Sequence, residues 1–276
     1  LVVITTAFVP TGGLTTVMMN YYRMMNKEEV KIDFASTNNP PQVLLDEIHA
    51  SGSEYYQLPD RKNVLAYFFA LKKLCRGYDG MHVHANSAMA VMELQAAIWA
   101  GIKIRIIHNH SSRSQHNLLN QLFLSLYRRS FTQAVACSDE AGEWLYGKNG
   151  FITLRNAINA KRFKFDVVKR LIMRHNFGFG DDEYVIGHIG KFMEAKNHPF
   201  LIEVFTKYHA LQPKSKLLLI GDGELRHLVE AAIDKNKVND CVILAGLRSD
   251  IPDVLQAIDI FLFPSIYEGM PLGVVD

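Results

Sequence analysis

Short runs of β-branched and other apolar residues alternate along the chain with longer segments in which apolar residues recur at helical spacing. The helical period is clear from Leu14 to Met25, and it returns at 64–74, 87–100 and 117–130. Ser87 and Ser138 stand where they could cap helix N-termini. The apolar runs between the helices predict strands at LVVITT, KIDFAS, MHVH, KIRIIH, QAVAC and FITL, which are residues 1–6, 31–36, 81–84, 103–108, 133–137 and 151–154.

This alternation breaks after Asn156 and starts again near residue 184. The intervening segment is first basic and then rich in Gly and Asp, and it shows no clear strand. The alternation predicts an α/β fold of two Rossmann-like parallel-sheet domains facing across a cleft, at 1–165 and 182–276, with a linker at 166–181. In the second domain we predict strands at YVIGHIG, KLLLIGDG, VILAG and IFLFPS and helices at 198–211, 224–236 and 252–258.

Composition excludes several classes of function. The chain has 276 residues and a net charge of +2, with 30 basic and 28 acidic residues, so no nucleic-acid partner is expected. The cysteines, Cys75, Cys137 and Cys241, form no C-x-x-C pair, which indicates neither a disulfide framework nor a thiolate metal site. No apolar run reaches the roughly 18 residues of a membrane span, and the first residues lack the basic leader of a signal peptide. We therefore expect a reduced, cytoplasmic location.

The segment VLAYFFAL, Val64–Leu71, is apolar but too short to cross a bilayer. Its pattern favours a helix with one buried face. The alternative is that the helix rests on the inner face of the cytoplasmic membrane as a peripheral contact. The pattern does not indicate an oligomeric state.

A pair of glycines, Gly12 and Gly13, follows the first predicted strand in PTGGLTT. Glycine lets the backbone approach a ligand closely, and the helix that follows directs its free N–H groups to the same place. The pair belongs to neither a G-x-G-x-x-G motif nor a Walker loop. Phosphate contact and a simple tight turn are both consistent with this pattern.

Histidines gather at the ends of two predicted strands. His82 and His84 share one face of the first of these strands, and His108 and His110 share one face of the next, with His116 nearby. Two H-x-H pairs could bind a metal, but no carboxylate or cysteine flanks them. Hydrogen bonding to a ligand and structural packing are the other two interpretations.

A loop with two lysines follows the first strand of the second domain. In GHIGKFMEAKNHPF the strand ends at Gly190, and Lys191 and Lys196 follow within six residues. Two ammonium groups at a strand end suit a diphosphate, whereas two solvated surface lysines are the simpler interpretation. The segments LIGDGEL, with Gly221, and AGLRSDIPDVL place further open backbone at the same edge of the sheet.

These motifs occur together and in order along the whole chain. The matching segments are PTGGLTTVMMNYYR, RIIHNHSS, ACSDEAGEWLYG, GKFMEAKNHPFLIEVF, LLLIGDGEL, AGLRSDIPDVLQAIDIFLFPS and YEGMPLGVVD. In this order they resemble the retaining GT-B glycosyltransferases that build bacterial exopolysaccharides and capsules. The resemblance implies transfer of a hexose or N-acetylhexosamine from a nucleoside-diphosphate sugar, with UDP as the expected nucleotide, to a glycan or lipid-linked acceptor. The first domain would then face the acceptor, and the second would bind the donor.

The stretch EGMPLGVVD corresponds in this resemblance to the family's E-x7-E signature, with Glu268 and Asp276 at its two ends. Pro271 suits the first turn of a helix, so Gly269 and Met270 would present backbone N–H groups to a phosphate. Glu268 would accept hydrogen bonds from hydroxyls of the donor sugar, and Asp276 from the ribose diol.

The resemblance also assigns roles to the other candidate residues. Lys191 and Lys196 would hold the diphosphate and stabilise it as it leaves. His110 or His108 would lie near the sugar. Gly12 and Gly13 would face the phosphates or the acceptor. No cofactor and no metal are expected. The backbone of Leu247 and Arg248 would border the base.

The chain departs from the family pattern at three places. Lys191 stands where the family usually has Arg, Asp276 where it has Glu, and NAIN, 156–159, where NGID is common. The chain also stops inside the signature helix, so we expect an incomplete second domain and little or no transferase activity. Two alternative functions remain, a nucleotide-sugar 2-epimerase of the same fold and a noncatalytic fragment that binds nucleotide-sugar.

Overall fold

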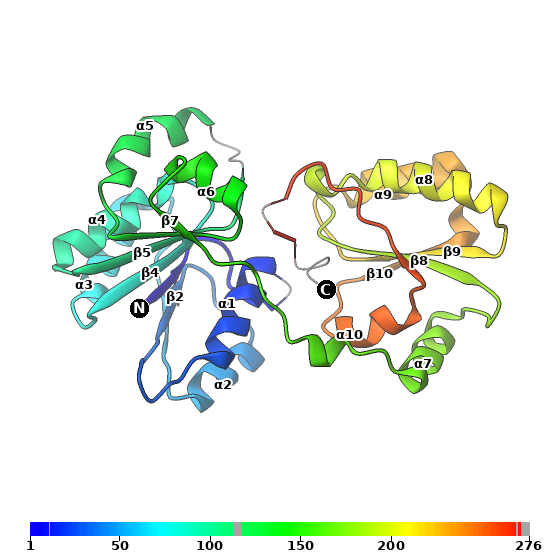
Figure 1. Cartoon of the computed structure of the whole chain (residues 1–276), viewed down its shortest axis with the longest axis horizontal. Coiled ribbons are helices and arrows are strands. Elements are labelled where there is room, and N and C mark those ends of the chain that lie inside the picture. Colours follow the sequence, from blue (N-terminus) through cyan, green and yellow to red (C-terminus); the bar gives the residue numbers. More distant parts are fainter. Residues whose placement is uncertain (11, 113–116, 269, 272–276) are drawn as a thin grey trace. The chain divides into compact units, whose positions relative to one another are not determined.

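The computed structural model describes residues 1–276 apart from 11, 113–116, 269 and 272–276, and it separates the chain into two compact units (Figure 1). The first unit comprises Leu1–Ile158 together with the later segment that contains Met270, and the second comprises Asn159–Glu268. Each unit is an α/β layer structure built on a parallel sheet, so the predicted fold class is confirmed. None of the described helices combines the length and the apolar composition that crossing a bilayer requires.

The first unit contains a parallel sheet of seven strands in the order β3-β2-β1-β4-β5-β6-β7. The order reverses between β1 and β4, as in a doubly wound sheet. The predicted strands are confirmed, and β3 is an additional strand that the apolar pattern did not indicate. The strands are β1 Val2–Ile4, β2 Phe34–Ser36, β3 Tyr55–Gln57, β4 Gly80–Ala85, β5 Ile104–Asn109, β6 Gln133–Ala136 and β7 Phe151–Thr153.

Helices cover both faces of this sheet (Figure 1). The first two helices bury their apolar residues in one core cluster, and the later four bury theirs in another. The Ser138 side chain caps its helix by accepting a hydrogen bond from the Ala141 N–H (3.2 Å), as predicted, whereas the Ser87 side chain makes no capping bond. The helices are α1 Gly13–Met24, α2 Gln42–Ala50, α3 Val64–Cys75, η1 Ala88–Ala90, α4 Val91–Ala100, α5 Asn117–Arg128 and α6 Asp139–Tyr146.

The second unit contains a parallel sheet of four strands in the order β10-β9-β8-β11. Helix α8 spans His198–Leu211, the range that the sequence predicts. The strands are β8 Tyr184–Ile189, β9 Ser215–Ile220, β10 Val242–Gly246 and β11 Ile260–Phe261. The other helical segments are η2 Ala160–Phe163, α7 Val167–Phe177, η3 Glu194–Lys196, α9 Arg226–Asn236, η4 Asn239–Cys241, α10 Ile251–Val254 and η5 Leu255–Ala257.

The segment predicted as a linker, 166–181, is instead mostly helix α7 of the second unit. Asp166 caps its first turn by accepting hydrogen bonds from the N–H groups of Val168 and Lys169 (2.9 and 3.1 Å). Gly178 ends the helix in the left-handed conformation, with φ of 72°. The helix therefore begins and ends with ordinary capping residues. The linker prediction was wrong because of the residues that the helix buries.

Helix α7 turns a cationic face toward its own unit. Arg170 and Arg174 both donate to the carboxylate of Asp259, at 2.5 and 3.3 Å. The Arg174 side chain is buried and also donates to the carbonyl oxygens of Gly180 and Glu183 (2.6 Å each). Two arginines occupy the inner face, whereas the apolar residues Leu171 and Ile172 are exposed, so the apolar pattern of the segment does not mark the face that it buries.

We predict that Arg174→Ala destabilises the second unit by roughly 3 kcal/mol, because it leaves buried acceptors without their donor. Hydrogen exchange of the β8 and β9 amides measures this loss locally. Arg226→Ala is the control, since Arg226 pairs with Asp222 and Glu230 at the exposed surface and its removal should change little. Equal protection in wild type and Arg174→Ala would contradict the assignment of α7 to this unit.

Candidate functional site

The strand order of the second unit reverses between β8 and β11, and ligands in such sheets bind at the carboxyl ends of the strands around that reversal. The loops that follow these two strands lie against each other. The Leu262 N–H donates to the Gly187 carbonyl (2.9 Å), and the Ile266 N–H donates to the Ala195 carbonyl (2.8 Å). These bonds bring the lysine-bearing loop beside the loop that carries Glu268.

Lys196 and Glu268 form an ion pair at this point, with Nζ and Oε1 2.6 Å apart. Both side chains are largely buried, at 17% and 25% exposure. The Lys196 Nζ also lies 4.7 Å from the centre of the Phe263 ring. The ammonium group is thus fixed between a carboxylate and an aromatic ring, and from there it can act as a point charge for an anionic ligand.

Two glycines allow the strand ends to approach closely. A Cβ added at Gly221 would lie 2.0 Å from the carbonyl oxygen of Gly190, and the φ of Gly221 is +142°. A Cβ added at Gly190 would lie 2.9 Å from His188 Nε2. Glycine at 190 and 221 is therefore required by packing alone. Contact of either residue with a ligand stays a prediction.

Two buried histidines that the sequence did not single out lie beside the Lys196 loop. The His188 Nδ1 lies 2.8 Å from the Leu262 carbonyl oxygen, which makes Nδ1 the protonated nitrogen of the neutral ring. Its ring lies 5.0 Å from that of His198, the first residue of α8. Burial lowers the pKa of His188 to about 4 and that of His198 to about 3. In the sequence the two histidines stand on either side of the lysine loop, in GHIG and KNHP, and this position could have marked them as candidates.

Two other charged residues predicted for this unit, Lys191 and Arg248, pair with acids other than Glu268. Lys191 is 61% exposed, and its Nζ lies 3.9 Å from Glu224, so its partner is not the acid that holds Lys196. Leu247 is exposed, and the guanidinium of Arg248 forms a bidentate pair with Asp250 (2.8 and 2.5 Å). Nothing in these contacts tests the predicted role of the 247–248 backbone.

The C-terminal signature is only partly described. Gly269 and Asp276, two predicted ligand-binding residues, lie outside the described residues. Met270 is described and clusters with the first unit, where its carbonyl oxygen accepts a hydrogen bond from Asn156 Nδ2 (2.6 Å). The prediction that the second domain spans 182–276 is therefore wrong for Met270, which belongs to the first unit.

In the first unit, the four predicted strand-end histidines form one cluster. Strand pairing sets His84 directly beside His108. His84 Nδ1 and His110 Nε2 share a hydrogen bond of 2.9 Å, and the His82 and His108 rings stack at 5.6 Å. Burial lowers the pKa of His82 to about 4 and that of His110 to about 3, and it holds the pKa of His84 and of His108 well below the usual value.

The cluster carries neutral imidazoles, the form that binds both metals and hydrogen-bonding ligands. One ring nitrogen from each of His82, His84 and His108 lies within 4.8 Å of the other two, which is a ligand set that zinc accepts. Among the described residues, neither ring nitrogen of His108 has a hydrogen-bond partner in the protein. The residues fit a metal and a polar ligand alike, so both interpretations of the histidines stay predictions.

The glycine pair of the first unit differs from that of the second. Gly12 precedes α1 with an ordinary φ of −82°, and a Cβ there would lie 3.2 Å from the Val9 carbonyl oxygen. Gly13 begins α1, and a Cβ there would meet no atom of the described residues within 4 Å. Packing therefore gives no reason for glycine at 13, which leaves close approach of a ligand as the interpretation to test.

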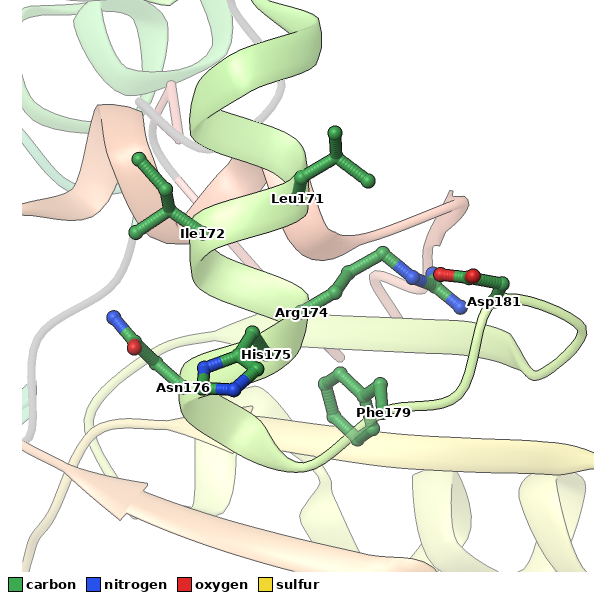
Figure 2. Close-up of a pocket in the computed structure, with 7 residues that line it drawn as sticks. All are labelled: Leu171, Ile172, Arg174, His175, Asn176, Phe179 and Asp181. Atoms are coloured by element: carbon green, nitrogen blue, oxygen red, sulfur yellow. The ribbon is translucent and has the colours of Figure 1, made fainter.

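A surface pocket of about 470 Å³ lies at another place on the second unit (Figure 2). It is formed by α7 and the turn before β8, which places it at the amino edge of the sheet. It therefore does not belong to the carboxyl-edge site. Its lining residues are Leu171, Ile172, Arg174, His175, Asn176, Phe179 and Asp181.

We predict that the second unit loses stability on acidification through His188. The pKa is about 4 in the folded protein and about 6.5 in an unfolded chain, so below pH 6.5 the unfolded chain gains a proton that the fold excludes. Stability is complete above that pH and should fall by roughly 2 kcal/mol near pH 5 from this residue. Urea unfolding followed by circular dichroism, at pH 5 and at a pH well above 6.5, measures the difference in the free energy of unfolding.

The variant His188→Gln should make the second unit less sensitive to acid by about that amount, whatever its stability at neutral pH. His175→Gln, at an exposed position, serves as the control. An unchanged pH dependence in His188→Gln would show that His188 is not held neutral by burial.

The chain is similar to known glycosyltransferases. Residues 169–276 match the family model described as "Glycosyl transferases group 1". The chain is 28% identical over 282 residues to the "Putative glycosyltransferase EpsF" of Bacillus subtilis (strain 168), covering 96% of this chain and 73% of that protein. It is 23% identical over 289 residues, with the same coverage, to the "UDP-Gal:alpha-D-GlcNAc-diphosphoundecaprenol alpha-1,3-galactosyltransferase" of Escherichia coli.

The fold also has solved counterparts. Anabaena Alr3699/HepE, crystallised in complex with UDP and glucose, superposes with a TM-score of 0.79 at 17% identity, over 96% of this chain and 73% of that one. At this identity the likeness concerns the fold, which is that of the GT-B glycosyltransferases. Residues 169–276, which carry the Lys196–Glu268 pair, are thus the part of the chain that matches the glycosyl transferases group 1 model.

Proposed function

We propose that the protein is a retaining glycosyltransferase that moves a sugar from a UDP-sugar to a glycan or lipid-linked acceptor in bacterial polysaccharide synthesis. The observation that carries this proposal is the Lys196–Glu268 pair at the reversal point of a group 1 glycosyltransferase domain. The names of the matched proteins support it, because one is a galactosyltransferase that uses UDP-Gal and a diphosphoundecaprenol acceptor, and HepE binds UDP and glucose.

Each member of the pair has a distinct role in the proposed reaction. Lys196 supports the departing diphosphate by placing a positive charge where negative charge develops. Glu268 accepts hydrogen bonds from hydroxyls of the donor sugar. In the absence of ligand the two groups neutralise each other, so donor binding must replace part of their mutual bond. The donor phosphate takes the proton of the acceptor on the face from which the nucleotide leaves.

The remaining predicted residues have supporting roles in this proposal. Lys191, being exposed, can turn from Glu224 toward a phosphate without cost in packing. His108 or His110, held neutral, can bond a sugar hydroxyl but adds no charge. We further propose that transfer requires no metal, because a lysine supplies the positive charge that a cation supplies in other transferases.

We predict that UDP raises the melting temperature of the protein equally with and without a chelator of divalent metals. The reason is that Lys196 and a helix N-terminus provide the diphosphate contacts. Differential scanning fluorimetry with UDP, UDP-glucose and a purine nucleotide control measures it. A shift that the chelator abolishes would refute metal independence, and no shift with any nucleotide would refute the donor site.

We predict that, in a chain that continues past Asp276, Lys196→Ala lowers kcat by about a hundredfold while the KM for the acceptor changes little, because the ammonium group that it removes acts on the leaving group. Release of UDP measures turnover, and the configuration of the new anomeric bond, read by NMR, tests retention. Lys214→Ala removes an exposed lysine that pairs with Asp182 in the same unit and is the matched control. Sugar epimerisation without acceptor would instead support the 2-epimerase, and UDP binding without turnover the noncatalytic fragment.

We predict that Gly13→Ala leaves the melting temperature unchanged or slightly higher but weakens activity at least tenfold. The added methyl group meets none of the residues that the structure describes, so a ligand that approaches the backbone is the group with which we expect it to clash. Gly221→Ala is the contrasting variant, since its methyl group would meet the Gly190 carbonyl oxygen and should lower stability itself. Full activity in Gly13→Ala would show that the glycine pair is only a turn.

A further inference from the structure

Helices α3 and α4 of the first unit pack side by side and expose large apolar residues on their outer surface. Leu65, Phe69 and Trp99 are 70%, 55% and 62% exposed. Val64 and Ile98 are exposed on the same helices. We call these five residues the α3–α4 patch. Its position can be followed from the labels of α3 and α4 in Figure 1.

The patch is continuous across the two helices. Leu65 and Phe69 are one helical turn apart on α3, so they are neighbours on its surface. The Phe69 ring lies 5.6 Å from that of Phe68, which in turn lies 5.6 Å from the Trp99 ring on α4. An apolar surface that runs between elements indicates a docking surface more strongly than scattered exposed residues do.

The residues of the patch are not those through which α3 packs into the core of its unit. Helix α3 already buries a separate stripe, formed by Tyr67, Leu71 and Cys75, in the core of the first unit. The helix is therefore apolar on two sides. The predicted buried face exists, but it does not account for Leu65 and Phe69.

Basic residues lie at the C-terminal ends of both helices. Lys72 and Lys73 lie in the last turn of α3, Arg76 follows that helix, and Lys103 follows α4. Lys72 Nζ lies 5.3 Å from the Trp99 ring. The one acid within the two helices is Glu93, which is fully buried and paired with Arg61 (2.9 Å). Two acids, Asp33 and Asp79, line a surface pocket together with Lys73, but the four basic residues still leave a local excess of positive charge.

Helix α7 provides a useful contrast. It also exposes apolar residues, among them Val168, Leu171 and Ile172, and it is also basic. However, Lys169 pairs with Asp253, and Arg170 and Arg174 pair with Asp259. Among the described residues, none of the four basic groups around the α3–α4 patch takes part in an ion pair of this kind. Their charge is available to an external anion.

We propose that the α3–α4 patch docks on the surface of an anionic phospholipid bilayer. Trp99 and Phe69 enter the interfacial region, where aromatic side chains are favoured, and the basic residues contact lipid phosphates. A second copy of the chain fits less well, because a symmetric pair through this patch would set its four cations against four others. The inference rests on these residues alone, so it can fail while the proposed transfer reaction stands.

The chain offers a direct optical test, because its two tryptophans are Trp99 and Trp144. In the full chain with Trp144→Phe, emission reports on Trp99 only. We expect a blue shift and quenching by brominated acyl chains with vesicles of phosphatidylcholine and phosphatidylglycerol, and a much smaller effect with pure phosphatidylcholine. Salt should weaken the binding.

Two variants in that background test the two parts of the surface. Phe69→Ser should reduce vesicle binding about tenfold or more, because serine brings much less apolar surface into the bilayer than phenylalanine does. Lys73→Gln should reduce it about fivefold and lower the preference for anionic lipid. Leu171→Ser, at an exposed position of α7 whose neighbouring basic residues are ion-paired, is the matched control and should bind as before. Circular dichroism and melting curves confirm that all the variants are folded.

Three outcomes would overturn the proposal. The first is Trp99 emission that stays unchanged with both kinds of vesicle. The second is an equal decrease of binding in Phe69→Ser and Leu171→Ser, which would mean that any exposed apolar residue suffices. The third is a concentration-dependent dimer, detected by analytical ultracentrifugation without lipid, that Phe69→Ser dissociates, since the patch would then bind a second copy.

Discussion

The carbonyl oxygen of Gly190 occupies the space that a side chain at position 221 would need. This contact between the ends of β8 and β9 determines the shape of the site in the second unit. It lets the loop after β8 follow the loop after β9, where the Phe192 N–H donates to the Asp222 carbonyl (3.0 Å). A Cβ at Gly223 would likewise lie 2.5 Å from the Phe192 carbonyl oxygen. With this loop fixed on one side by β9 and on the other by the loop after β11, Lys196 has a defined position.

The second constraint is that the histidines at the strand ends are buried and therefore uncharged, and it applies in both units. The histidines at the strand ends, His84 and His108 in one unit and His188 in the other, lose their hydration in the fold, which lowers the pKa of each. Neutral rings can donate and accept hydrogen bonds near neutral pH but add no positive charge. In the second unit this leaves Lys196 as the positive group that faces Glu268. The division suits a site that needs one fixed cation and several neutral hydrogen-bonding groups.

Helices α7 and α3 are both basic and both expose apolar residues, but their basic side chains have different partners. Helix α7 turns its arginines inward to Asp259, a residue of the segment before β11, and thereby joins its unit. Helix α3 keeps Lys72 and Lys73 near an exposed apolar patch. The difference lies in where the acids are: Asp259 is in reach of one helix, whereas Glu93 is buried beneath the other. Charge counting along the chain cannot distinguish the two cases.

The alternation of strands and helices could be predicted from the amino-acid pattern, because burial of one face gives each element a period that is visible among neighbouring residues. The same pattern predicted α8 to the residue. The family resemblance named Lys196 and Glu268 as candidate site residues, and their roles stay a prediction. Tertiary structure decided what depends on partners distant in sequence. Arg170 and Asp259, which make α7 part of the second unit, are 89 positions apart, and Lys196 and Glu268 are 72 apart. The exposure of Lys191 and Phe69, the empty space at Gly13 and the obstructed space at Gly221 are set by groups that no local period reports, because only folding brings those groups together.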